Sequence, residues 1–193
     1  HRLAPQASSF THYQRAGGAL PDDRVQALWV DRRGDLWIGT WSGLVRLARG
    51  STRFEPMLAD PAQPGSLAGR MVTMLGEAPD GRIWAGTRQG DLVLIDPATG
   101  QGVPAPAATM SFSAMVAGTS DEIWLSGDNG IQLRQATDGR LVKHLQRDRG
   151  KPWGLAANNV VAVLRDRSGV MWAGSYGGGL QRSSPGAGLW VRR

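Results

Sequence analysis

Apolar and polar positions alternate along most of this chain in short runs that end at turn-forming residues. In the first such segment, residues 25–30 alternate, residues 31–34 supply a turn, residues 36–40 alternate again, and a second turn leads into residues 44–47. A period of two is typical of strands, and short connections between strands produce hairpins. A fourth run at 54–58 completes the group, so the pattern predicts a four-stranded antiparallel meander.

The same phrase occurs four times, and each copy carries a tryptophan in its second run. These tryptophans recur at intervals of roughly 40–50 residues, a period typical of stacked or radial repeat folds. We therefore predict an all-β fold, a β-propeller fragment built of four-stranded antiparallel blades. The repeated tryptophans are Trp37, Trp84, Trp124 and Trp172.

The copies also predict how the chain is divided. One partial propeller is expected over residues 1–193, with the end of a preceding blade at 1–19 and its outermost strand, an orphan, at 10–14. The third copy departs from the pattern, because its turn glycine is missing and its strand glycine is shifted by one residue. The four blades themselves are expected at 20–58, 66–103, 110–145 and 157–193.

The tryptophans and the glycines beside them have predicted structural roles. Each indole is expected to wedge between neighbouring sheets, where burial contributes a few kcal/mol at roughly 25 cal/mol per Å². Glycines lie two residues beyond three of these tryptophans, inside a strand, where glycine usually marks a bulge or a close backbone approach. These glycines are Gly39, Gly86 and Gly174.

The repeated phrase, VQALWVDRRGDLWIGTWSGL in its first copy, resembles the two-component regulator propeller repeat, V-x-x-I-x-x-D-x-x-G-x-L-W-I-G-T-x-x-G-L. The connection DPAQPGSL at 60–67 resembles the linkage between blades in that family. The resemblance implies the periplasmic sensor region of a bacterial inner-membrane signalling protein. It also implies a non-catalytic role and an output domain, a histidine kinase or a diguanylate cyclase, in the full-length chain.

The ends of the chain resemble parts of blades, which predicts that the sequence is a piece of a longer propeller. A propeller usually closes with about four to eight blades. Exposed blade edges should then favour self-association, or else the four blades close tightly on themselves.

Charge and composition narrow the possible functions. The net charge is +6 and the pI about 10.9, but the basic residues, almost all Arg, are scattered. A surface that follows nucleic-acid phosphates needs clustered cations, so nucleic-acid binding is not expected, and coding bias explains the Arg content more simply. The absence of Cys excludes disulfides and thiolate sites. No run reaches the roughly 18 apolar residues of a membrane helix, so we expect neither a membrane helix nor a signal peptide within the sequence as given.

Residues suited to catalysis are few. His144 is the one histidine outside the lead-in segment, and no metal site or cofactor is expected, because the turns at Asp31 and Asp166 lack the further carboxylates of calcium loops. An alternative is a streptogramin-lyase-like propeller enzyme, since such lyases share the phrases at 80–84 and 95–100. Those enzymes need a histidine and an acidic magnesium ligand at the central face. A purely structural or protein-interaction propeller also remains open.

A ligand of the sensor is expected at one face of the disc. There the connections between blades emerge together with the turns between second and third strands, and loops of this kind usually carry binding residues. Aromatic rings beside amide and guanidinium donors suit a small polar ligand such as a saccharide. The candidates are Trp41, Arg88, Asp128, Asn129, Trp153, Asn158, Asn159 and Tyr176.

Overall fold

The computed structural model describes residues 9–118, 121–150, 154–183 and 190–192 of the chain. Their strands form four separate four-stranded antiparallel sheets, each in simple chain order. This confirms the predicted all-β fold with four-stranded blades. Within the described residues, no helix is both long and apolar enough to cross a lipid bilayer.

The sheets are numbered as blades in chain order. The first blade contains β1 (Val25–Val30), β2 (Leu36–Thr40), β3 (Gly43–Leu47) and β4 (Phe54–Met57). The second contains β5 (Val72–Glu77), β6 (Ile83–Thr87), β7 (Leu92–Ile95) and β8 (Gly102–Pro104). The third contains β9 (Phe112–Ala117), β10 (Glu122–Gly127), β11 (Gly130–Gln135) and β12 (Leu141–Leu145). The fourth contains β13 (Val160–Arg165), β14 (Met171–Ser175), β15 (Gly179–Ser183) and β16 (Trp190–Arg192).

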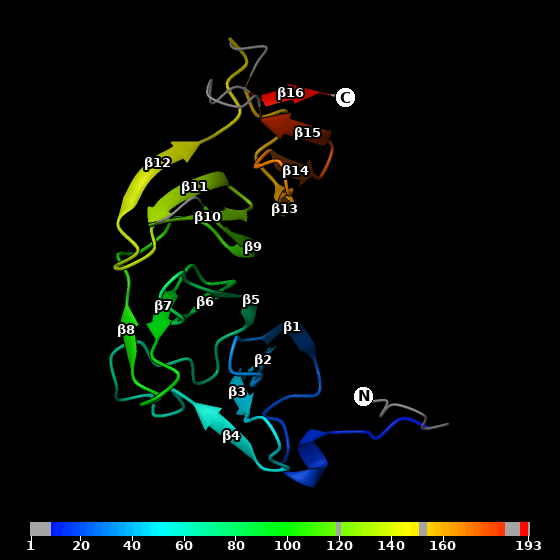
Figure 1. Cartoon of the computed structure of the whole chain (residues 1–193), viewed down its shortest axis with the longest axis vertical. Coiled ribbons are helices and arrows are strands. Elements are labelled where there is room, and N and C mark those ends of the chain that lie inside the picture. The colour runs from blue at the N-terminus through cyan, green and yellow to red at the C-terminus, as the bar shows by residue number, and fades with distance from the viewer. Residues whose placement is uncertain (1–8, 119–120, 151–153, 184–189, 193) are drawn as a thin grey trace.

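The blades follow one another along an open arc (Figure 1). The first strands of successive blades, β1, β5, β9 and β13, lie in contact along the inner side of the arc, whereas β4, β8 and β12 form its outer rim. The first and fourth blades stand at opposite ends. The alternative of four blades closed on themselves is therefore wrong.

The orphan strand expected at 10–14 does not form. Thr11 alone makes an isolated bridge, and a short 3-10 helix, η1 (Arg15–Gly17), follows. A strand needs a neighbour along its whole length to pair its backbone groups, and none of the four sheets takes up this segment. The segment still contacts the first blade, because the rings of Tyr13 and Phe54 lie 5.0 Å apart.

Tryptophans fill the junctions between blades. Trp37 and Trp84 have no exposed surface, and each packs among apolar residues of its own blade and of the next one. Trp124 is partly buried in the third junction, beside Val160 and Ala173 of the fourth blade. Trp172 belongs to the last described blade and is only partly buried. Each blade therefore covers the indole of the blade before it.

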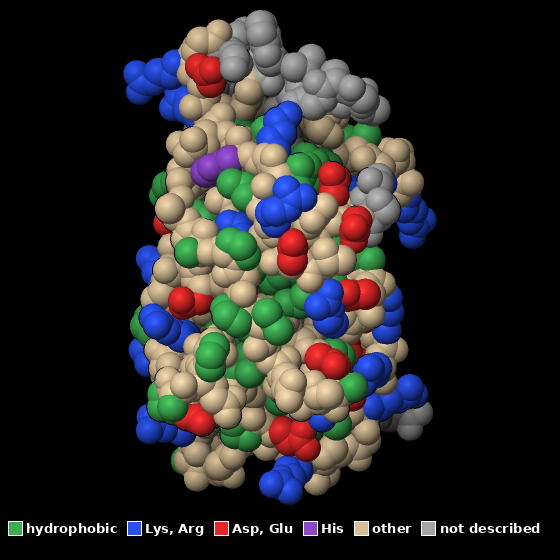
Figure 2. All heavy atoms as spheres, turned by 90° about the vertical axis from the view of Figure 1, so that its left-hand side faces the viewer, with side chains coloured by type: hydrophobic (Ala, Val, Ile, Leu, Met, Phe, Trp, Pro, Cys, Tyr) green, Lys and Arg blue, Asp and Glu red, His purple; other side chains and the backbone are tan. Residues whose placement is uncertain are grey.

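Arginines add hydrogen bonds across the same junctions. Arg46 donates to the carbonyl of Pro97 at 2.6 Å, Arg82 donates to the carbonyl of Thr137 at 3.0 Å, and Arg165 donates to that of Gly118 at 3.0 Å. Each bond joins a side chain of one blade to the backbone of its neighbour. On the rim side, Figure 2 shows basic, acidic and apolar side chains interspersed, with no continuous stripe of cations on that face.

Two of the repeated tryptophans, Trp37 and Trp172, are fixed by an aspartate six residues earlier. Oδ2 of the buried Asp31 accepts the Nε1–H of Trp37 at 2.9 Å, while Oδ1 accepts the backbone N–H groups of Arg33 and Asp35 at 2.9 Å each. The carboxylate thus closes the turn between β1 and β2 and satisfies the indole at the same time. Asp166 repeats this arrangement, with its Oδ2 2.8 Å from Nε1 of Trp172.

The strand glycine lies where the next blade begins. A Cβ on Gly39 would meet the carbonyl oxygen of Val72 at 2.7 Å, and one on Gly86 would meet the Cβ of Phe112 at 2.9 Å. At Gly174, in the last described blade, the nearest atom is the Cβ of Ala162 at 3.8 Å. The absence of a side chain therefore permits close packing of one blade on the next.

Replacement of Gly39 by Ala should destabilise the fold. The added methyl would force the start of β5 away from β2, and overpacking of this kind costs about 1–3 kcal/mol. Gly174→Ala is the matched control, because the same substitution at the equivalent position meets only ordinary contacts. Urea unfolding measures both variants, and equal midpoints for the two would contradict the proposed close approach.

Loss of the Asp31 carboxylate should also destabilise the first blade. Asp31→Ala leaves the Trp37 indole and two turn N–H groups without an acceptor, which we expect to cost about 2–3 kcal/mol. The control is Asp138→Ala, since exposed Asp138 accepts a single bond from the Arg140 N–H. Thermal unfolding should show a clear loss for the first variant and almost none for the second.

Stability should depend on pH through Asp166. Hydrogen bonds from Ser168 and then from Trp172 lower the pKa of Asp166 from 3.8 to about 2. Because the folded-state pKa is depressed, the stabilisation is complete above the unfolded-state pKa and is lost as the pH falls from about 4 toward 2. Urea midpoints at about pH 5 and pH 2.5 should therefore differ less for Asp166→Asn than for the parent chain. An identical difference in both proteins would count against this coupling.

Candidate functional site

The same irregularity occurs in the first strand of every blade. The pairing between the first and second strands shifts by one residue, between Val25 and Ala27 in β1 and at the equivalent place in β5, β9 and β13. Such a β-bulge inserts one residue, bends the strand and changes the direction of a side chain. The inserted residues are Gln26, Thr73, Ser113 and Val161.

All four bulge residues line one cavity on the inner side of the arc, which we call the central cavity. Its volume is about 460 Å³, within the usual range for small-molecule sites. Because β1, β5, β9 and β13 all contribute, a ligand bound there would contact four blades at once. The full lining is Gln26, Thr73, Arg88, Ser111, Phe112, Ser113, Asp128, Asn159 and Val161.

A repeated backbone hydrogen bond arranges the opening of this cavity. In each blade, the N–H of the residue after the second strand donates to the carbonyl of the residue before the first strand. The pairs are Trp41 to Arg24 at 3.1 Å, Arg88 to Met71 at 2.9 Å, Asp128 to Ser111 at 3.3 Å, and Tyr176 to Asn159 at 2.8 Å. We call the four donor residues, Trp41, Arg88, Asp128 and Tyr176, the mouth positions.

Some polar side chains of the central cavity already form hydrogen bonds within the protein, and others do not. Asp128 accepts from the N–H of Ser111 at 2.8 Å and from its hydroxyl at 2.9 Å. Thr73 donates its hydroxyl to the carbonyl of Phe112 at 2.6 Å. The side chains of Arg88 and Asn159 are exposed, and neither forms a hydrogen bond or ion pair with another described residue. These two side chains therefore keep their hydrogen-bonding capacity for a ligand.

Trp41 occupies the mouth position of the first blade, and its ring carries a cation on one face. The guanidinium carbon of Arg24 lies 4.0 Å from the centre of its ring, and Arg24 is held by Asp22 through bonds of 2.9 and 2.7 Å. The hydrogen bond from Arg24 also holds the pKa of Asp22 well below its usual range. Trp41 is 38% exposed and Tyr176 is 80% exposed. Both aromatic residues occupy mouth positions, and neither belongs to the lining of the cavity.

The structure brings together three of the residues predicted from the sequence, Arg88, Asp128 and Asn159. It separates two others. The amide of Asn129 donates to the Thr109 carbonyl at 3.3 Å and accepts from Gln146 at 2.6 Å, and Oδ1 of Asn158 accepts the Arg147 N–H at 2.6 Å. These two asparagines fix loops between blades. Trp153 lies outside the described residues.

The sequence analysis missed the bulge residues. Gln26, Thr73 and Ser113 follow the first apolar residue of each inner strand, at equivalent places in three copies. A polar residue repeated at one position of an otherwise apolar strand was the available signal. Its meaning depends on the pairing register, which the sequence pattern does not specify.

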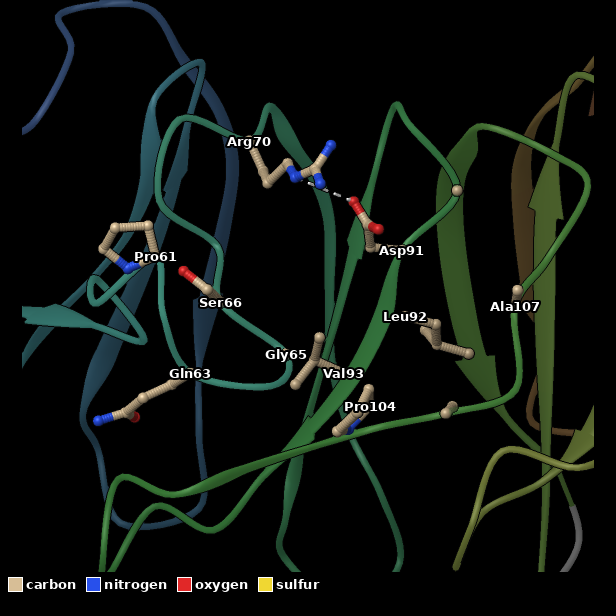
Figure 3. A pocket seen from close by; sticks show the side chains of 12 residues that line it. Pro61, Gln63, Gly65, Ser66, Arg70, Asp91, Leu92, Val93, Pro104 and Ala107 are labelled. Carbon is tan, nitrogen blue, oxygen red and sulfur yellow. Dashed lines mark ion pairs between the residues drawn. The ribbon is translucent and has the colours of Figure 1, made fainter.

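A second, outer cavity of about 290 Å³ lies between the connection at 59–70 and the second blade. Figure 3 shows Arg70 and Asp91 facing each other at one end, with Val93 and Pro104 on an apolar side. Nε of Arg70 lies 3.6 Å from Oδ2 of Asp91, which also accepts the Thr87 hydroxyl at 2.9 Å. The charges that line this cavity are thus already matched.

The central cavity offers hydroxyl, amide, carboxylate and guanidinium groups. Its lining contains no histidine. In the described parts of the chain, no group of three or more His, Cys, Asp or Glu residues is arranged to hold a metal ion. The arrangement is therefore suited to holding a polar molecule by directional hydrogen bonds.

Two segments of the chain, residues 19–42 and 154–177, match the family model of the two-component regulator propeller. Each segment contains one of the two aspartate–indole pairs, Asp31 with Trp37 and Asp166 with Trp172. A search of curated proteins finds no match.

Solved structures with the same fold include extracellular domains of two putative hybrid two-component systems from B. thetaiotaomicron. The BT4673 domain gives a TM-score of 0.79 at 20% identity, over 98% of this chain and 24% of that one. The BT3049 domain gives 0.68 at 20% identity, over 89% and 22%. A catalytically inactive virginiamycin B lyase from Staphylococcus aureus, solved with quinupristin, gives 0.70 at 15% identity, over 90% and 58%.

The chain spans about a quarter of the length of the two extracellular two-component domains. At these identities the likeness establishes the fold, a run of propeller blades. The repeated phrase and the two matched segments add the identity of the repeat. Residues 19–42 and 154–177 therefore match the repeat of the two-component regulator propeller, and they do so within a run of propeller blades.

Proposed function

We propose that this chain is part of a non-catalytic sensor in which the central cavity binds a small polar ligand such as a saccharide. The observation that carries the proposal is the convergence of bulge residues from four blades on one polar cavity. A bulge kept at the same place in every inner strand aims side chains at a common point.

The chemistry of the cavity suits a molecule rich in hydroxyl groups. Such a ligand both donates and accepts hydrogen bonds, and the side chains of Gln26, Ser113 and Asn159 can do the same. The rings of Trp41 and Tyr176 are exposed at two of the four mouth positions, and Phe112 lies in the lining of the cavity. Pockets that combine a few directed polar groups with aromatic surface are typical of small-molecule sites.

Signalling would follow if a ligand that contacts several blades changed their spacing. Binding can shift a conformational equilibrium only if the ligand prefers one of the two arrangements. A molecule that contacts four inner strands meets this condition when it favours one spacing of the blades. We place the chain in the periplasm, and we infer an output domain, a histidine kinase or a diguanylate cyclase, in the full-length protein. The extracellular two-component domains with this fold support both assignments.

The lyase alternative receives less support from the geometry. His144 lies on β12 at the outer rim, where its Nε2 is 2.7 Å from the carbonyl oxygen of Asn129. The lining of the central cavity contains neither His144 nor another histidine. The residues that line this cavity therefore supply no histidine for the chemistry that the lyase alternative requires.

Asn159→Ala should weaken saccharide binding about fivefold, because one hydrogen bond contributes about 1 kcal/mol. Calorimetric titration against a set of neutral and acidic disaccharides measures the effect. Asn129→Ala is the matched control, since that amide lies near the same face but outside the cavity. The proposal is wrong if none of the sugars binds, or if Asn129→Ala weakens binding as much as Asn159→Ala.

A further inference from the structure

Opposite charges occupy neighbouring mouth positions of the central cavity without pairing with each other. Arg88 belongs to the second blade and Asp128 to the third, and both line the cavity. No ion pair joins them in the described structure. Each is therefore available to a ligand that lies between the second and third blades.

The two charges are not equivalent. One oxygen of Asp128 accepts the N–H of Ser111 and the other accepts its hydroxyl, so local dipoles already compensate this carboxylate. Arg88 has no comparable acceptor among the described residues. The unbalanced group facing the cavity is thus a guanidinium.

Two arginines at the same end of the blades show how this differs from the usual arrangement. Arg24 is bound by both oxygens of Asp22, and Arg70 lies 3.6 Å from Asp91. An arginine within two residues of the first strand therefore pairs with a carboxylate in both the first and the second blade. Arg88, which directly follows β6 in the second blade, has no such carboxylate among the described residues and lines the central cavity.

We propose that the ligand of the central cavity is an acidic saccharide, whose carboxylate pairs with Arg88 while its hydroxyl groups bind Asp128 and Asn159. This inference rests on the proposed sensor function and narrows its ligand. A guanidinium presents its N–H groups as a planar fork that matches a carboxylate through two parallel bonds. Asp128 keeps lone pairs for sugar hydroxyls, because an ionised carboxylate has about four acceptor positions and Ser111 uses two.

The test compares two sugars that differ only in the group at C6, digalacturonate with carboxylates and galactobiose of the same linkage with hydroxymethyl groups. Calorimetric titration of the chain should show digalacturonate binding about tenfold or more tightly, since hydrogen bonds to charged groups are stronger than neutral ones. The preference should decrease as the salt concentration rises, because this pair is solvent-accessible.

Arg88→Met should abolish the preference for the acidic sugar, and Arg88→Lys should retain part of it. Circular dichroism checks that these exposed substitutions leave the fold intact. The matched control is Arg70→Met, which removes an arginine from the outer cavity at the same face and should leave the preference unchanged.

Each outcome separates this inference from the broader proposal. Equal affinity for the two sugars, or a preference that survives Arg88→Met, overturns the acidic ligand and leaves saccharide sensing in place. A loss of preference in Arg70→Met as large as in Arg88→Met also overturns it, because the charge effect would then be unspecific. Failure of both sugars to bind overturns both proposals.

Discussion

Burial of one indole by the following blade is the interaction on which this structure depends. A single four-stranded sheet cannot cover its own tryptophan. Trp37 loses all exposure only because residues of β5, β6 and β7 pack over it, and Trp84 depends in the same way on β9 and β10. Removal of such large apolar surfaces from water is the dominant stabilising contribution in folds of this kind. The junctions therefore hold the blades in order, and the positions of all inner strands follow from them.

The close approach of successive blades at the strand glycine also determines the shape of the central cavity. The strand glycine lets the next blade approach within van der Waals distance, as at Gly39 and Val72. The bulge lies opposite this glycine, since Gly39 pairs with Ala27 immediately after the inserted Gln26. Tight packing of blades and the inward direction of bulge side chains thus occur at the same level of each sheet. Binding specificity can then vary through the bulge and mouth residues without disturbing the indole layer.

The sequence predicted the strands well because alternation with a period of two is a direct signature of half-buried strands. It failed at residues 10–14, where an apolar pattern exists but no sheet offers a partner. Loop position alone brought out Arg88, Asp128 and Asn159, yet it could not separate them from Asn129 and Asn158. That distinction depends on hydrogen bonds between loops. The scattered arginines, first attributed to coding bias, include several that bind carbonyl groups of a neighbouring blade.

The four copies of the repeat differ in whether an aspartate binds the indole N–H of the tryptophan. Asp31 and Asp166 bind the indole N–H of their blades, but the equivalent residue in the second blade is Ala78. The buried Nε1 of Trp84 has no hydrogen-bond partner among the described residues. A buried donor without an acceptor costs about 1–3 kcal/mol. The second blade tolerates this cost because Trp84 is packed on both sides by apolar residues. Trp172 is less buried, and there the aspartate remains. Burial alone does not decide where the aspartate is kept, because the fully buried Trp37 has it, whereas the partly buried Trp124 follows Gly118. The matched family segments are the two that keep the bond.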